Sequence, residues 1–92
     1  MTRQEFEPLL AQVPGWETVD DSKLTRSFSF SDWAGAQAFV VAAGEIAEEA
    51  GHHPDLLLRW GEVRAEIYTH KIHGLAEADF ILAAKLSRLY GK

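Results

Sequence analysis

Three histidines of this chain have the chemistry and the spacing of a general acid–base site. His52 and His53 are adjacent, and His70 follows 18 residues after His52. Imidazole can give or take a proton near neutral pH without help from its surroundings. Glu48 lies one helical turn before His52, so its carboxylate is expected to reach that ring and fix its tautomer. From the spacing alone two interpretations are open: the three are ordinary surface or hydrogen-bonded histidines, or His52 and His70 form an acid–base pair, with Glu48 hydrogen-bonded to His52.

The strands next to these histidines are predicted to form one hairpin. Alternating side chains predict strands over residues 56–60 and 63–69, joined around Gly61. His52 precedes the first strand and His70 follows the second. A hairpin brings those two ends together, so we expect the two rings to face a common cleft.

The remaining pattern predicts helices that cover a sheet. A capping-box sequence at Thr2, helical spacing of apolar residues and alternating strands define the other elements. They are a helix from Thr2 that ends at Pro14-Gly15, strands at 16–19 and 24–30, and helices at 33–50 and 76–89. The order α-β-β-α-β-β-α predicts an α+β fold, with three helices packed on one face of a four-stranded antiparallel sheet. We expect one domain over residues 1–92.

Composition and charge narrow the function classes. The chain has 92 residues, no cysteine and a formal net charge of −5. Disulfides and thiolate metal sites are therefore excluded, and the negative charge weighs against direct nucleic-acid binding. The first residues carry no long apolar stretch, so we expect neither a signal peptide nor a membrane anchor. We therefore expect a cytoplasmic protein that does not bind a membrane.

A metal site is the other chemistry that these residues allow. Three neutral imidazoles and a carboxylate can bind zinc. However, the chain has no HExxH helix, and adjacent residues in an extended segment point to opposite faces. Pro54 favours such extended geometry for His53. We therefore expect no metal, and we interpret His73 as an ordinary surface histidine.

The spacing of seven residues resembles the signature of the pterin-4a-carbinolamine dehydratase family. Four further short patterns in this chain are also similar to that family, in the same order along the sequence. The signature residues are Glu48, His52, His53, Pro54, Trp60, His70 and Asp79, and the other patterns are Gly15-Trp16, Phe28-x-Phe30, Thr69-His70 and Gly74-Leu75.

The resemblance implies an enzyme of tetrahydrobiopterin recycling that uses neither a metal nor an organic cofactor. Family members dehydrate 4a-hydroxytetrahydropterin, the product of aromatic amino-acid hydroxylases, to quinonoid dihydropterin and water. They form dimers in which two sheets join edge to edge, or tetramers built from helix packing. The catalytic residues implied are His52, His53, His70 and Glu48, and the substrate-binding residues are Asp79, Trp60 and Thr69.

Several roles stay open at this point. Asp79 either orients His70 or holds the pterin ring, or it is simply an acidic residue in the first turn of a helix. Trp60 either stacks on or lines the pterin site, or it is a core residue, and we interpret it as a core residue. Some family members carry an aromatic residue where this chain has Leu56, which leaves the physiological pterin open.

The alternative function is a non-catalytic pterin-binding protein, or a dimerisation partner of the coactivator type, on the same scaffold. The helix predicted over 76–89 is apolar on more than one face, which indicates either an oligomer interface or an ordinary core helix with a few exposed residues.

Overall fold

The computed structural model describes residues 1–91, and within them the helices and strands follow the predicted order. A short 3₁₀ helix, η1, is an addition to the predicted elements. The elements are α1 (Arg3–Leu10), β1 (Glu17–Val19), β2 (Lys23–Ser29), α2 (Trp33–Ala50), β3 (Asp55–Arg59), β4 (Glu62–Ile67), η1 (His70–Ile72) and α3 (Glu77–Tyr90).

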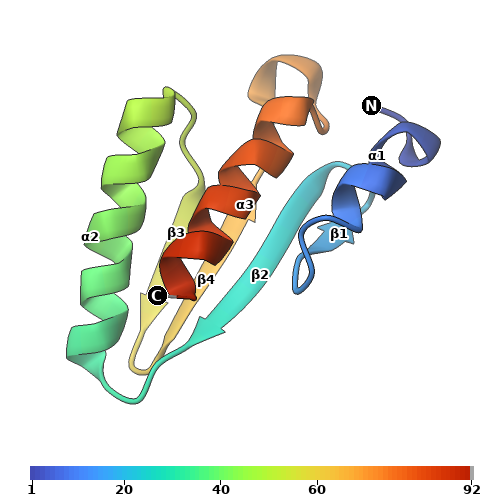
Figure 1. Ribbon diagram of the computed structural model, residues 1–92. Helices are drawn as coiled ribbons and strands as arrows, with labels where there is room; N and C mark the ends of the chain where they lie inside the picture. Colours follow the sequence, from blue (N-terminus) through green and yellow to red (C-terminus); the bar gives the residue numbers. More distant parts are fainter. Residues whose placement is uncertain (92) are drawn as a thin grey trace.

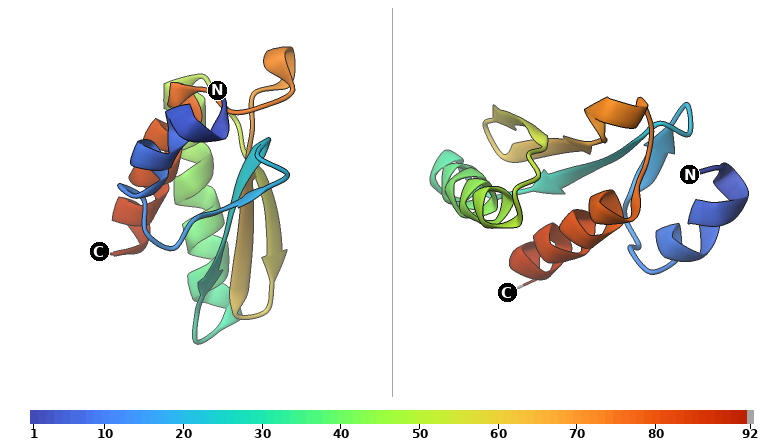
Figure 2. Two further views of the ribbon diagram at one scale, coloured as in Figure 1. Left: turned by 90° about the vertical axis from the view of Figure 1, so that its right-hand side faces the viewer. Right: turned by 90° about the horizontal axis from the view of Figure 1, so that it is seen from above.

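The four strands form one antiparallel sheet in the order β1-β2-β4-β3. In the register, β4 pairs on one side with β2 (Phe28 opposite Val63) and on the other with β3 (Asp55 opposite Glu66). All three helices lie on the same face of this sheet (Figures 1 and 2). The predicted α+β architecture is therefore confirmed.

The core lies between the sheet and the helices because the strands alternate as predicted. Val63, Ala65 and Ile67 of β4 are fully buried, whereas Arg64, between them, is exposed on the face without helices. Residues of α2 and α3 complete the core. They include Ala36, Phe39, Ala43, Ala47, Phe80, Leu82, Ala83 and Leu86. Burial of this apolar surface is the main force that holds α3 against the sheet.

Arg26 is the one charged residue on the inner face of β2, and its side chain joins three parts of the fold. Its guanidinium lies 4.6 Å from the centroid of the Phe28 ring and donates a hydrogen bond of 3.0 Å to Ser87 Oγ on α3. Trp16 Nε1 donates to the same hydroxyl at 2.8 Å. This arrangement keeps the charge hydrogen-bonded at the core boundary, where an unpaired charge would be costly.

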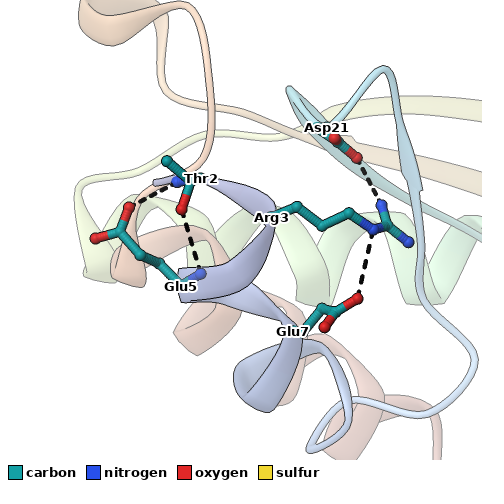
Figure 3. A network of polar contacts seen from close by, with 5 residues as sticks. All are labelled: Thr2, Arg3, Glu5, Glu7 and Asp21. Atoms are coloured by element: carbon teal, nitrogen blue, oxygen red, sulfur yellow. Dashed lines mark hydrogen bonds and ion pairs between the residues drawn. The ribbon is translucent and has the colours of Figure 1, made fainter.

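The first helix is capped and tethered by polar side chains (Figure 3). Thr2 and Glu5 form the predicted capping box, and Arg3 pairs with Glu7 and with Asp21 in the turn before β2. The predicted end at Pro14-Gly15 is wrong, because α1 ends at Leu10. Beyond it the backbone forms tighter turns, in which the N–H groups bond to carbonyls three residues back.

The apolar surface of α3 is used within the chain rather than left free. Phe80, Leu82 and Leu86 are buried, and Leu89 and Tyr90 pack against the core. Of the large apolar residues in α3, only Ile81, which is half exposed, faces outward. The structure thus favours the interpretation of α3 as a core helix. Among the described residues, no helix is long and apolar enough to cross a membrane.

Candidate active site

The connection from α2 to β3 presents His52 and His53 at one end of the sheet. Gly51 ends α2 in the left-handed conformation, with a φ of +67°, which glycine adopts without a steric penalty. His52, His53 and Pro54 follow, and β3 begins at Asp55. Because Asp55 pairs with Glu66, this connection lies beside the residues that follow β4. The predicted meeting of the two hairpin ends is therefore confirmed.

A buried carboxylate joins these two ends to α3. Asp79 is fully buried, and its Oδ1 lies 2.5 Å from Nε2 of His52. Its Oδ2 accepts hydrogen bonds from the Thr69 hydroxyl at 2.9 Å and from the backbone N–H of Ala76 at 2.8 Å. A carboxylate with three donors around it is satisfied as the charged form. We therefore assign the Nε2 proton of His52 to the bond with Asp79, which leaves Nδ1 as the ring nitrogen without a proton.

The start of α3 favours a negative charge at this point. Asp79 is the third residue of α3, and its contact with the Ala76 N–H satisfies one of the backbone donors that a helix leaves free at its first turn. The positive end of the helix dipole lies at the same place. Asp79 is thus both a helix-capping residue and the group that orients His52.

The predicted pairing of Glu48 with His52 is wrong, and the alternative in which Asp79 orients His70 is not found. Glu48 does not reach His52. Instead its Oε1 lies 3.0 Å from Nε2 of His53, and both side chains are mostly exposed. The reason is the left-handed Gly51, which ends the helical spacing before either histidine. Similarly, Asp79 contacts the ring of His52 and not that of His70.

His70 lies one residue beyond Thr69, at the start of η1, and its side chain is exposed. Its ring packs against Tyr68, with 4.5 Å between the ring centroids and 62° between the ring planes. Tyr68 was missed by the sequence analysis. The signal that could have found it is the alternation along the strand, which places residues 68 and 70 on the same side of Thr69.

Trp60 is not a core residue, so that interpretation is wrong. It is 71% exposed and lies in the turn between β3 and β4, at the far end of the hairpin from His52. Trp60 is therefore not among the residues of this chain that contact Asp79, which are His52, Thr69 and Ala76. Among the described residues, no three potential ligands are grouped so that they could hold a metal ion.

The surface hollow between α2 and α3 is a separate feature. Its volume is about 210 Å³, and Ile46, Glu49, Lys85, Arg88 and Leu89 line it. None of the four histidines is among them. We therefore locate the candidate site by the contacts of Asp79, Thr69 and the histidines rather than by this hollow.

The family model described as pterin 4 alpha carbinolamine dehydratase matches residues 1–89. This chain belongs to that family. A relative from Rubrobacter xylanophilus is 50% identical over 86 residues, which cover 94% of this chain and 80% of that protein. A second, from Methylococcus capsulatus, is 48% identical over 90 residues, with 97% and 79% covered. Both relatives are named after the same dehydratase.

Solved structures show the same fold. The transcriptional coactivator/pterin dehydratase from Brucella melitensis superposes with a TM-score of 0.93 at 33% identity, over 99% of this chain and 98% of its own. A pterin dehydratase-like protein described as a RuBisCO assembly factor in the alpha-carboxysome gives a TM-score of 0.72 at 25% identity, over 85% and 92%. The fold of this family thus occurs in proteins with different described roles.

Proposed function

We propose that this protein dehydrates 4a-hydroxytetrahydropterin to quinonoid dihydropterin and water. The observation that carries the proposal is the orientation of His52 by the buried Asp79, whose other carboxylate oxygen accepts a hydrogen bond from Thr69, the residue before His70. Membership of the family supplies the class of substrate. The proposal includes a role in tetrahydrobiopterin recycling in the cytoplasm, after an aromatic amino-acid hydroxylase.

The reaction needs one proton acceptor and one proton donor. The N5–H bond breaks, a double bond forms between N5 and C4a, and the C4a–O bond breaks as the hydroxyl takes up a proton and leaves as water. No electron is lost or gained, and the proton removed balances the proton added. Each positioned acid or base contributes about 10²–10⁴-fold to such a step, which is about 3–5 kcal/mol of barrier.

His52 and His70 are the acid–base pair in this proposal, as predicted. The Nε2–H of His52 is held by Asp79, so its Nδ1 is the nitrogen that exchanges the proton with the substrate. His53, oriented by Glu48 at the exposed side, is assigned to substrate binding. Thr69 and Asp79 act mainly by holding the site together, because each uses its polar atoms in the contacts described above.

The proposal is tested by a stopped-flow assay in which a hydroxylase generates the carbinolamine and its loss is followed by ultraviolet absorbance. We expect the protein to accelerate this loss. His70→Ala should lower the acceleration by about 10²-fold or more, because it removes a general acid or base. The matched control is His73→Ala, which changes an exposed histidine three residues further on and should keep the wild-type rate. Equal rates for the two variants would contradict the assignment.

A folded wild-type protein without acceleration would favour the alternative, a pterin-binding or dimerisation protein of the coactivator type on the same scaffold. The two structural relatives support considering this alternative, because one is described as a coactivator/dehydratase and the other as an assembly factor.

The proposal includes a homo-oligomer in which the β3 edges of two chains pair. β3 is an outer strand of the sheet, and Leu57, at its middle, is 49% exposed. An uncovered apolar edge strand is a template for pairing with another chain. Antiparallel pairing about Leu57 would place the exposed Trp60 of one chain next to Pro54 of the other, beside the partner chain's histidines.

Light scattering at micromolar concentration tests this arrangement. We expect the mass of a dimer or a tetramer, compared with 10.3 kDa for the single chain. Trp60→Ala should lower the dehydration rate although Trp60 is far from the histidines of its own chain. A monomer with full activity would contradict the proposed pairing.

A further inference from the structure

Tyr68 lies beside the proposed site, in contact with His70, although it is not one of the seven signature residues. It follows β4 directly and continues the face of the sheet that carries Arg64 and Glu66, where no helix packs. Its neighbour Thr69 turns inward to Asp79, and the next residue, His70, returns to the side of Tyr68. Tyr68 and His70 therefore flank the segment that Asp79 anchors.

The Tyr68 ring is itself held by its surroundings. The Lys23 ammonium lies 5.5 Å from the ring centroid, and Lys23 Nζ is 3.5 Å from Glu66 Oε1. Partial burial of the phenol raises the pKa of Tyr68 above its ordinary value, and the negative charge of Asp55 adds to this shift. Tyr68 is thus neutral at physiological pH, and its half-buried ring is bracketed by side chains of β2, β3 and β4.

The three histidines of the site differ in what orients them. His52 contacts Asp79 and His53 contacts Glu48, so each has a carboxylate partner. For His70 the structure of residues 1–91 records no side-chain hydrogen bond, and its ring contact is with Tyr68. Edge-to-face packing at this distance is a favourable geometry for aromatic rings. An exposed imidazole without this contact would be free to occupy other rotamers.

We propose that Tyr68 is a positioning residue, whose ring holds the His70 imidazole in the orientation needed for proton transfer. This inference rests on the proposed dehydratase function. It assigns to a tyrosine ring the task that carboxylates perform for the other two histidines. The ring, and not the hydroxyl, is the group that acts on His70.

The test compares Tyr68→Leu with Tyr68→Phe in the stopped-flow assay. Tyr68→Leu should lower kcat by about tenfold, because a misplaced proton donor or acceptor loses part of its catalytic effect. KM should stay within about twofold, since Tyr68 acts through His70 and not on the substrate. Tyr68→Phe keeps the ring and should keep kcat within about threefold of wild type.

Arg64→Leu is the matched control, because it replaces a large side chain on the same face of the sheet, within β4 and away from His70. It should leave kcat unchanged. Proton NMR provides a readout that a merely structural role would not move. The His70 ring protons should shift when the Tyr68 ring is removed, return to their wild-type positions in Tyr68→Phe, and show cross-relaxation with the Tyr68 ring in the wild type.

The outcomes separate this inference from the proposed function. An active wild type with unchanged kcat in Tyr68→Leu would overturn the role of Tyr68 alone. A raised KM with unchanged kcat would also overturn it, by making Tyr68 a binding residue. A wild type without dehydratase activity would contradict the proposed function. If Tyr68→Leu does not fold, two other results would still overturn the positioning role. One is an absence of cross-relaxation between the His70 and Tyr68 rings in the wild type, and the other is a tenfold loss of kcat in Tyr68→Phe.

Discussion

Replacing His52 by glutamine is expected to lower kcat/KM for dehydration by about 10²–10⁴-fold, the contribution of one positioned acid or base. The side chain of His52 is only about 20% exposed, and its Nε2 is bonded to Asp79, so its ring has one defined orientation. Glutamine keeps a donor for Asp79 but cannot exchange a proton at neutral pH. The same stopped-flow assay measures the effect, with the melting temperature as a check of folding.

The control for His52→Gln is the change of Glu48 to glutamine. Glu48 contacts His53 and not His52, and this contact lies at the exposed surface. Exposed pairs of this kind contribute little, so Glu48→Gln should lower kcat/KM by less than about tenfold. A loss in Glu48→Gln as large as that in His52→Gln would contradict the assignment made from the structure.

Replacing Asp79 by alanine should have the largest effect on stability. Asp79 is fully buried, and its removal leaves three donors without an acceptor: His52, Thr69 and the N–H of Ala76. Each unsatisfied buried group costs about 1–3 kcal/mol, although relaxation of the half-exposed members reduces the sum. We expect a loss of about 2–4 kcal/mol in the free energy of unfolding, which is a large fraction of the total for a small domain.

Equilibrium unfolding in urea measures this loss. Glu77→Ala is the control, because Glu77 lies in the same first turn of α3 but is exposed. Its effect should stay within about 0.5 kcal/mol. If the two variants unfold at the same urea concentration, the carboxylate of Asp79 does not hold the ends of the hairpin and α3 together.

The positions of the histidines could be predicted from the sequence because local signals determine them. Gly51 ends α2, Pro54 starts the extended segment, and the alternation in β3 and β4 defines a hairpin whose ends must meet. These signals require no knowledge of how α3 packs. The capping pattern at Thr2 is local in the same way, and it is present as predicted.

The partners of the histidines could not be predicted, because they depend on tertiary packing or on a change of backbone direction. The pairing of Glu48 with His52 assumed that helical spacing continues, but Gly51 changes the direction of the chain and brings His53 to Glu48 instead. Which histidine Asp79 contacts depends on where α3 lies on the sheet. Trp60 looked like a core residue by type, yet the paired register ends at Arg59 and leaves the indole in the turn.

The measurement that tests the central claim most directly is a double-mutant cycle of His52→Gln and Asp79→Asn, read as the dehydration rate under conditions where all four proteins are folded. The claim is that Asp79 acts on the reaction through His52. We predict that Asp79→Asn alone lowers kcat by about 10–100-fold, because a His52 ring that is no longer oriented loses part of the effect of a positioned acid or base. It should cause no further loss once His52 is replaced. Losses that multiply in the double variant, or a wild type that does not accelerate dehydration, would contradict the account.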